Sequence, residues 1–274
     1  MQFEIAIRAS QGARRAQEDT ALSWPLPATG SDSTSLMELP LPVAGEAVAV
    51  LCDGMGGHAG GAMAGRLAAE AFLANAAGHT GTARDRLYQS LELANATIAA
   101  KIVDNSRFRG MGSTLVAVHL GPDGLSWVSV GDSLLYLWRG GKIVPLNADH
   151  SLAPEIDKLA ESGKITWAQA QADPRRHYLR SALTGDDIEM IDLSERVAPL
   201  LKGDVVVLAS DGIHTLGTDE IALVVSAMER HGASPIAARL LSLIEAAGAP
   251  HQDNTTVVVI KILDAGQPLS AGHV

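Results

Sequence analysis

Four carboxylates stand where short apolar runs of this sequence end or begin. Asp53 closes an apolar run and is followed by a glycine-rich turn, and Asp132 and Asp211 close two later runs. Asp253 stands just before a fourth run, residues 255–262. Asp-Gly is a common turn dipeptide, so Asp53 alone is equally consistent with an ordinary turn. The repetition of one arrangement favours a shared site.

In an antiparallel sheet the end of one strand lies beside the start of its neighbour, so the four carboxylates can meet at one rim. Clustered carboxylates repel one another unless a cation compensates them. Mg²⁺ and Mn²⁺ prefer oxygen ligands, whereas one cysteine and scattered histidines form no recognisable zinc cage. Two such ions that share a carboxylate are suited to attack on phosphate esters, with an arginine holding the phosphoryl oxygens. The residues alone therefore predict a metal-dependent phosphoester hydrolase.

The composition excludes several classes of partner and location. The 274 residues carry 21 Lys and Arg against 31 Asp and Glu, a formal charge of −10, which argues against nucleic acid and anionic membrane as partners. Cys52 is the single cysteine, so no internal disulfide can form and a cytoplasmic location is predicted. No run approaches the ~18 apolar residues of a membrane span. Aromatic residues make up only 4%, which predicts an aliphatic core.

Hydrophobic periodicity predicts a mixed chain in which an antiparallel meander lies between helical segments. Thr82 with Asp85, and Thr166 with Gln169, resemble capping boxes, and Thr218 is a predicted helix cap. The predicted strands are 2–9, 20–24, 47–52, 113–120, 125–130, 134–139, 142–146, 189–197, 204–211 and 255–262. The predicted helices include 62–77, 84–103, 154–162 and 167–172.

Three segments differ from this pattern. Residues 25–45, rich in Pro, Ser and Thr, predict a long mobile hairpin loop, and residues 265–274 a frayed tail. Residues 147–187 contain two short helices and a basic cluster that includes Arg176 and His177. From composition alone, this segment is equally consistent with a solvated surface and with an excursion over an active site that contacts an anionic substrate.

Seven short motifs in order resemble one known family over nearly the whole chain, from about residue 5 to 262. They are Arg14 with Glu18 and Asp19, DGMGGH at 53–58, GMGSTL at 110–115, VGDS at 130–133, ADHSL at 148–152, SDGI at 210–213, and Asp253-Asn254 with Thr256. The family is the metal-dependent Ser/Thr protein phosphatases (PPM) in their bacterial form. The resemblance implies an α+β fold, a four-layer α-β-β-α sandwich with two central antiparallel sheets flanked by helix pairs. One phosphatase domain would span 1–264, with a flap subdomain at about 147–187.

The resemblance also implies a role for each site residue. Asp53 would bridge two Mn²⁺ or Mg²⁺ ions, with the Gly54 carbonyl as a further ligand, and Asp211 and Asp253 would complete the first ion's shell. Glu18 and Asp19 would act through metal-bound water, and Asp132 would help to hold a weaker third ion. Arg14 would hold the substrate phosphate, with Arg15 as the alternative, and Arg176 is the predicted substrate contact in the flap.

The implied reaction is direct attack of metal-bound hydroxide on phosphoserine or phosphothreonine in protein substrates, which would reverse a bacterial Ser/Thr kinase. Met55 stands where many relatives carry a histidine as general acid, so His58 is the nearest substitute and metal-bound water the alternative. Asp173 replaces a histidine common in bacterial flaps. Two other functions are considered, a hydrolase of small phosphorylated metabolites and a catalytically silent scaffold. The scaffold is disfavoured because Asp53, Asp211 and Asp253, the aspartates that the resemblance implies as metal ligands, are all present.

Overall fold

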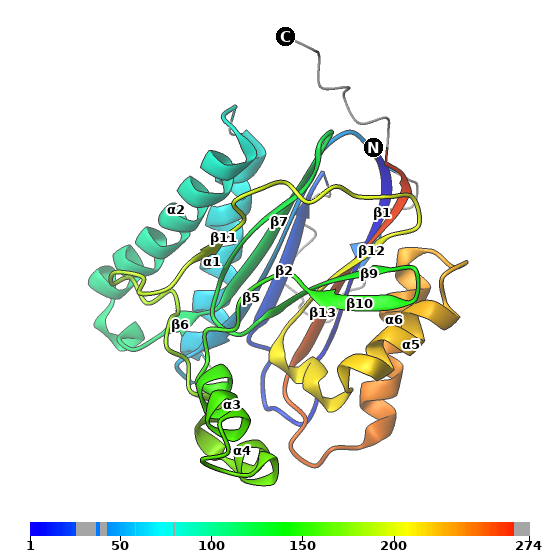
Figure 1. Cartoon of the computed structure of the whole chain (residues 1–274). Helices are drawn as coiled ribbons and strands as arrows, with labels where there is room; N and C mark the ends of the chain where they lie inside the picture. The colour runs from blue at the N-terminus through cyan, green and yellow to red at the C-terminus, as the bar shows by residue number, and fades with distance from the viewer. Residues whose placement is uncertain (26–36, 39–42, 58, 79, 266–274) are drawn as a thin grey trace.

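Two antiparallel β-sheets pack face to face in this computed structural model, and a pair of helices covers the outer face of each sheet (Figure 1). The structure describes residues 1–25, 37–38, 43–57, 59–78 and 80–265. These layers confirm the predicted four-layer α-β-β-α sandwich.

The first sheet has the strand order β10-β9-β12-β13-β1-β3, with β4 also paired to β1. Its strands are β1 (Gln2–Ser10), β3 (Met37–Glu38), β4 (Val43–Ala44), β9 (Leu134–Arg139), β10 (Lys142–Pro145), β12 (Val205–Ala209) and β13 (Thr255–Asp264). The second sheet has the order β11-β8-β7-β5-β2, with β6 also paired to β5. Its strands are β2 (Asp19–Trp24), β5 (Ala47–Met55), β6 (Gly112–Ser113), β7 (Leu115–Gly121), β8 (Gly124–Val130) and β11 (Asp192–Leu193).

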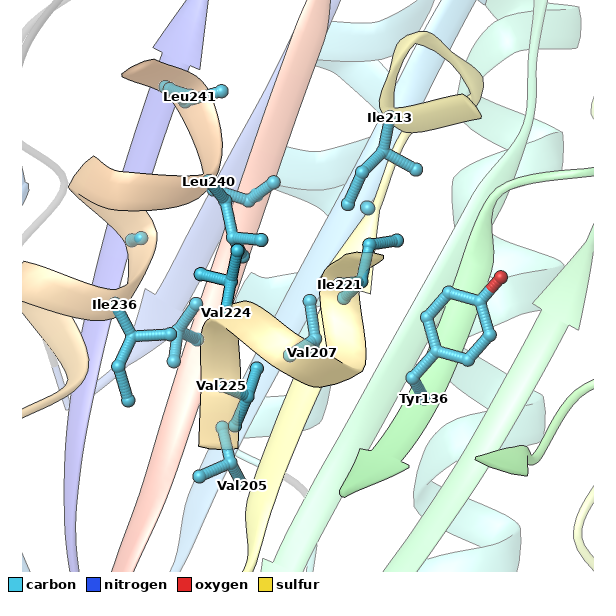
Figure 2. Close-up of a cluster of buried hydrophobic side chains, with 14 of the residues drawn as sticks. Tyr136, Val205, Val207, Ile213, Ile221, Val224, Val225, Ile236, Leu240 and Leu241 are labelled. Carbon is cyan, nitrogen blue, oxygen red and sulfur yellow. The ribbon is translucent and has the colours of Figure 1, made fainter. Parts of the chain in front are cut away.

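Three apolar layers hold the sandwich together, and aliphatic side chains dominate them, as the composition predicts. One layer, which includes Ile5, Leu51 and Val258, lies between the sheets. A second lies between the second sheet and helices α1 (Ala59–Gly78) and α2 (Ala83–Asp104). A third lies between the first sheet and helices α5 (Thr218–Ala227) and α6 (Ala233–Ala247). Figure 2 shows this third layer, where Val205 and Val207 of β12 meet side chains of both helices.

The flap predicted at 147–187 contains α3 (Ala153–Glu161), α4 (Trp167–Ala172) and the 3₁₀ helix η2 (Pro174–His177). A small apolar cluster around Ile156 and Ala170 holds the first two helices together. The capping box of Thr166 and Gln169 is confirmed, since each side chain bonds the other residue's backbone N–H. Two further 3₁₀ helices are η1 (Ser106–Phe108) and η3 (Asp211–Thr215).

Three local predictions are wrong. The strand that carries Asp53 continues to Met55, because the backbone of its last residues pairs with β6. The strand predicted at 189–197 shrinks to β11. Thr218 is the first helical residue and not the cap, since Gly217 takes the cap position and its N–H donates to the Glu220 carboxylate at 2.8 Å. Most of the predicted loop 25–45 and nearly all of the tail 265–274 lie outside the described residues.

No helix in the part of the chain that the structure describes combines the length and apolarity that crossing a membrane requires.

Candidate metal centre

The strand registers bring the predicted carboxylates to one end of the sandwich. Asp19, at the start of β2, pairs directly with Asp53 on β5. In the other sheet β12 ends opposite the start of β13, so Asp211 and Asp253 follow and precede these strands at the same end. Asp132 lies in the short connection between β8 and β9. Antiparallel pairing within each sheet, and the stacking of the two sheets, therefore place these carboxylates around one opening.

That opening is a cleft of about 930 Å³. The predicted site residues that line it are Arg14, Glu18, Asp53, Gly54, Asp132, Asp211 and Asp253. Asp19 lies behind this lining and is only 4% exposed. His58, the predicted general acid, falls outside the described residues.

Hydrogen bonds from the turn before the last strand fix the loop that carries Arg14 and Glu18. The Asn254 side chain accepts from the Glu18 backbone N–H at 2.8 Å and donates to the carbonyls of Gln11 and Ala16 at 2.9 and 3.0 Å. The N–H of Ala13 also donates to the Gln252 carbonyl at 2.8 Å. This loop is therefore held against the Asp253 turn by backbone groups as well as by side chains.

Two glycines allow the backbone around Asp53 to pack closely. A Cβ on Gly54 would lie 2.0 Å from the carbonyl oxygen of Gly61 on α1. A Cβ on Gly61 would lie 1.9 Å from the Glu18 carboxylate. Both distances are far inside van der Waals contact, so only glycine lets the Glu18 carboxylate approach this turn.

Asp53 itself is held from the β6–β7 side. Its N–H donates to the Thr114 hydroxyl at 3.1 Å, and its carbonyl accepts from the Thr114 N–H at 2.8 Å. The Ser133 hydroxyl hydrogen-bonds that of Thr114 at 2.8 Å and so joins the Asp132 connection to the same scaffold. The carboxylates are thus presented by backbone whose polar groups are already paired.

The carboxylates disturb one another's ionisation. Burial raises the pKa of Asp19 to about 7, against a hydrogen bond from Ser210 that lowers it. Burial, and then the charges of Asp19 and Asp211, raise the pKa of Asp53 well above its usual value. Burial and the charge of Asp211 raise the pKa of Asp132 to about 7. Burial and the charge of Asp253 raise the pKa of Asp211. A cation placed among these groups would remove the cost of ionising them.

The donor set fits hard divalent ions. Every group in the cleft named above as a candidate ligand is an oxygen donor, and the buried Oδ1 atoms of Asp19 and Asp211 find no hydrogen-bond partner among the described residues. Within the same residues no three His, Cys, Asp or Glu side chains already stand at the spacing of an ion shell. Asp253, for example, forms an ion pair with Arg14. An ion held by Asp253 would therefore have to compete with Arg14 for this carboxylate.

These pKa shifts predict how the metal-free protein responds to pH. Asp132 is protonated in the native state up to about pH 7 but ionises near pH 4 when unfolded, so the unfolded state binds fewer protons in this range. Its contribution to stability is full below pH 4 and is lost as pH rises through 7. In EDTA, the melting temperature of Asp132→Asn minus that of wild type is therefore expected to increase from pH 5 to pH 7.5. Thermal unfolding at several pH values measures it, and a constant difference would contradict the assignment.

Arg176 does not line the cleft, contrary to its predicted contact with substrate. Its guanidinium donates to the Asp157 carboxylate at 2.5 and 3.2 Å, which joins η2 to α3. The flap residues that do line the cleft include His177, Tyr178 and Arg180. Composition locates the basic cluster but cannot say which of its side chains turn inward.

Burial and contacts make the roles of three other residues clear. Cys52 is fully buried and burial raises its pKa, which agrees with an inert thiol. His150 is structural, since it is buried and its Nδ1 accepts from the N–H of Gly131 at 3.2 Å. Gln252 was not predicted, although its side chain bonds Gly212, Thr255 and Thr215 and so fixes the turn after β12. A lone glutamine in a loop carries no pattern that would reveal this.

A four-layer sandwich with an acidic cleft at one end of its two sheets is the architecture of the metal-dependent protein phosphatases. A family model described as protein phosphatase 2C matches residues 42–252. The chain belongs to this family, and the resemblance drawn from the seven motifs is confirmed.

Bacterial relatives show the extent of the likeness. The Ser/Thr protein phosphatase PstP of Mycobacterium tuberculosis is 35% identical over 237 residues, which are 84% of this chain and 44% of PstP. This chain thus spans less than half the length of that relative. The protein phosphatase PhpP of Streptococcus pneumoniae is 28% identical over 80% of this chain and 87% of its own length.

Solved structures agree over a longer span. The crystal structure of M. tuberculosis PstP/Ppp superposes with a TM-score of 0.73 at 27% identity, covering 96% of this chain and 100% of PstP/Ppp. A structure of the PstP catalytic domain in complex with two manganese ions superposes with a TM-score of 0.72, covering 96% and 99% of the two chains.

Proposed function

We propose that this protein is a metal-dependent protein serine/threonine phosphatase, which hydrolyses phosphoserine and phosphothreonine in proteins and so reverses a bacterial Ser/Thr kinase. One observation carries the proposal. Aspartates from both sheets converge on a cleft that also presents Arg14. The manganese ions in the PstP structure support the same chemistry for a relative.

The ions would be two Mn²⁺ or Mg²⁺, with a weaker third. The ligands would be Asp53, the Gly54 carbonyl, Asp211 and Asp253. Glu18 and Asp19 would act through water, and Asp132 would help to bind the third ion. When bound, the ions activate water and neutralise the charge that develops on the phosphoryl group.

The chain's own residues bind and orient the substrate. Arg14 would hold the phosphoryl oxygens, since a guanidinium matches two of them at once. Its loop is already fixed by Asn254, so this group is presented with little further loss of conformational freedom. Residues of this loop and the flap residues 177–180 both line the cleft, so a protein segment around the phosphorylated residue would contact both.

The test is hydrolysis of a phosphothreonine peptide and of p-nitrophenyl phosphate with Mn²⁺, with Mg²⁺ and with EDTA, for wild type and Asp211→Asn. We expect turnover that depends on metal and that falls at least about 100-fold both in EDTA and in the variant. Turnover indifferent to EDTA and to the substitution would contradict the mechanism. A folded protein that binds metal but turns over neither substrate would favour the scaffold function.

A further inference from the structure

The proposed reaction needs a proton at the leaving group. When the phosphorus–oxygen bond breaks, the serine or threonine oxygen keeps the electron pair and leaves as an alkoxide, which is a strong base. A protonated side chain within reach of this oxygen lowers the barrier by general acid catalysis. Met55, two residues after Asp53, lines the cleft but its thioether carries no proton to give.

His177 lies where such a donor is required. It ends the 3₁₀ helix η2 of the flap, and its exposed side chain lines the same cleft as Asp53, Asp211 and Asp253. Its charge also acts on one of these carboxylates. Burial and the charge of Asp253 raise the pKa of Asp211, and the charges of His214 and His177 act in the opposite direction. His177 therefore lies close enough to Asp211 to affect its ionisation and, unlike His214, also lines the cleft.

The imidazole of His177 is free to meet a substrate. Within the described residues its side chain makes no hydrogen bond and no ion pair, either with the metal-ligand candidates or with any other group. Two of the cleft's other cationic side chains are engaged, since Arg14 pairs with Asp253 and Arg180 with Glu155. Guanidinium groups also keep their protons at neutral pH, whereas imidazole titrates close to it.

The flap holds this histidine in place. The Asp173 carboxylate accepts from the Arg175 N–H at 2.9 Å at the start of η2, and Arg176, next to His177, clamps Asp157 on α3. Just after His177, the Tyr178 carbonyl accepts from the Leu152 N–H at 3.0 Å. Contacts on both sides of one residue restrict where its side chain can point, as a catalytic group requires.

We propose that His177 is the general acid of this phosphatase and donates a proton to the leaving serine or threonine oxygen. A water oxygen forms the new bond to phosphorus, and the old phosphorus–oxygen bond breaks. Its electron pair takes the proton from the His177 imidazolium, which gives free hydroxyl side chain, inorganic phosphate and neutral imidazole. The imidazole then regains a proton from solvent. This assignment rests on the proposed phosphatase function.

The experiment compares two leaving groups in His177→Gln, with Mn²⁺ present. In the phosphothreonine peptide the leaving group is the threonine oxygen, which departs as a strongly basic alkoxide and needs the proton. In p-nitrophenyl phosphate the leaving group is p-nitrophenolate, a weak base that departs without one. We expect kcat on the peptide to fall about 100-fold and kcat on p-nitrophenyl phosphate to change by less than about threefold. His214→Gln is the matched control, because His214 is exposed on η3 and does not line the cleft, and both activities should stay within about threefold of wild type.

A pH profile supplies the second readout. The kcat of wild type on the peptide should decline on the alkaline side as the acid loses its proton, and this limb should vanish in His177→Gln. The charged groups that share the cleft with His177 are Arg14, Arg15, Glu18, Asp53, Asp132, Arg180, Asp186, Asp187, Glu189, Asp211 and Asp253. His214 lies near it on η3, and Arg176 precedes it on η2. All of them remain in the variant, so the comparison isolates the imidazole.

The outcomes separate this assignment from the function on which it rests. Equal losses on both substrates would overturn it in favour of a role in binding or in flap structure. Unchanged kcat on the peptide would overturn it as well. A wild-type protein that hydrolyses neither substrate with Mn²⁺ would overturn the phosphatase function itself. If wild type is active but the ratio of kcat on the peptide to kcat on p-nitrophenyl phosphate is the same in His177→Gln, only the assignment of His177 as general acid is overturned.

Discussion

Asp53→Asn is expected to lower kcat/KM on a phosphothreonine peptide by at least about 1,000-fold while making the metal-free protein more stable. The loss corresponds to about 4 kcal/mol of transition-state stabilisation. Asp53 is the proposed bridge between two ions, and an amide supplies only one neutral oxygen in its place. The gain in stability has the same origin, because the substitution removes the negative charge of the Asp53 carboxylate that would bind the ions.

The sign of the stability change follows from the pKa of Asp53. Burial and the charges of Asp19 and Asp211 raise that pKa in the native state well above its unfolded value. A carboxylic acid with a raised native pKa contributes stability below its unfolded pKa and loses it as pH rises through the native one. At pH 7.5 and without metal, Asp53 therefore opposes folding, and an isosteric amide removes the opposition. Removing the charge also stabilises a protein whose neighbouring carboxylates repel it.

Thermal unfolding at pH 7.5, in EDTA and in Mn²⁺, measures the effect. The variant should melt above wild type in EDTA, and the upward shift that Mn²⁺ gives wild type should shrink or disappear. Asp204→Asn is the matched control. Asp204 is also buried, but its carboxylate accepts from the Arg139 guanidinium at 2.6 and 2.8 Å, so its loss should lower the melting temperature and leave activity intact. A variant of Asp53 that melts below wild type in EDTA would contradict this account.

The placement of the carboxylates could be predicted from sequence because it depends only on where strands start and stop. Apolar runs bounded by Asp-Gly reveal strand ends, and antiparallel pairing then brings Asp53, Asp211 and Asp253 to one rim. The helices were predicted within a few residues for a similar reason, since a period of 3.6 residues and a capping pair such as Thr166 and Gln169 are local signals. The four-layer arrangement required the motifs and their order.

Features that depend on which way a side chain turns could not be predicted. Arg176 and His177 are neighbours in one basic cluster, yet the first clamps Asp157 and the second lines the cleft. The extension of β5 to Met55 depends on a partner strand about 60 residues away. The acidic residues Asp186 and Asp187, which line the same cleft, lie in a segment with no periodic pattern. Long-range packing decides all three.

Arg14→Ala is expected to lower kcat/KM on the phosphothreonine peptide by about 100-fold without weakening the affinity for Mn²⁺. The loss is that of a guanidinium that holds two phosphoryl oxygens as charge develops on them. The affinity for Mn²⁺ is expected not to weaken for a separate reason. Arg14 pairs with Asp253, a proposed ligand of the first ion, and an ion that binds Asp253 must displace this pair.

Removing Arg14 frees Asp253 and also removes a positive charge beside the ions. Both changes favour the binding of Mn²⁺. The gain in affinity should be small, because 59% of the Arg14 side chain and 32% of the Asp253 side chain are accessible and solvent screens the pair. Titration of activity with Mn²⁺ gives the affinity, and steady-state kinetics on the peptide gives kcat/KM. A rise in the Mn²⁺ requirement would instead make Arg14 part of the scaffold of the metal centre.

Arg15→Ala decides between the two adjacent arginines. Arg15 also lines the cleft, but it lacks the ion pair with Asp253 that ties Arg14 to the metal centre. If Arg14 is the phosphate clamp, Arg15→Ala should lower kcat/KM by no more than about fivefold, as expected for an exposed charge at the rim. The reverse ranking of the two variants would transfer the clamp to Arg15, and equal losses in both would indicate that the two guanidinium groups share the phosphate.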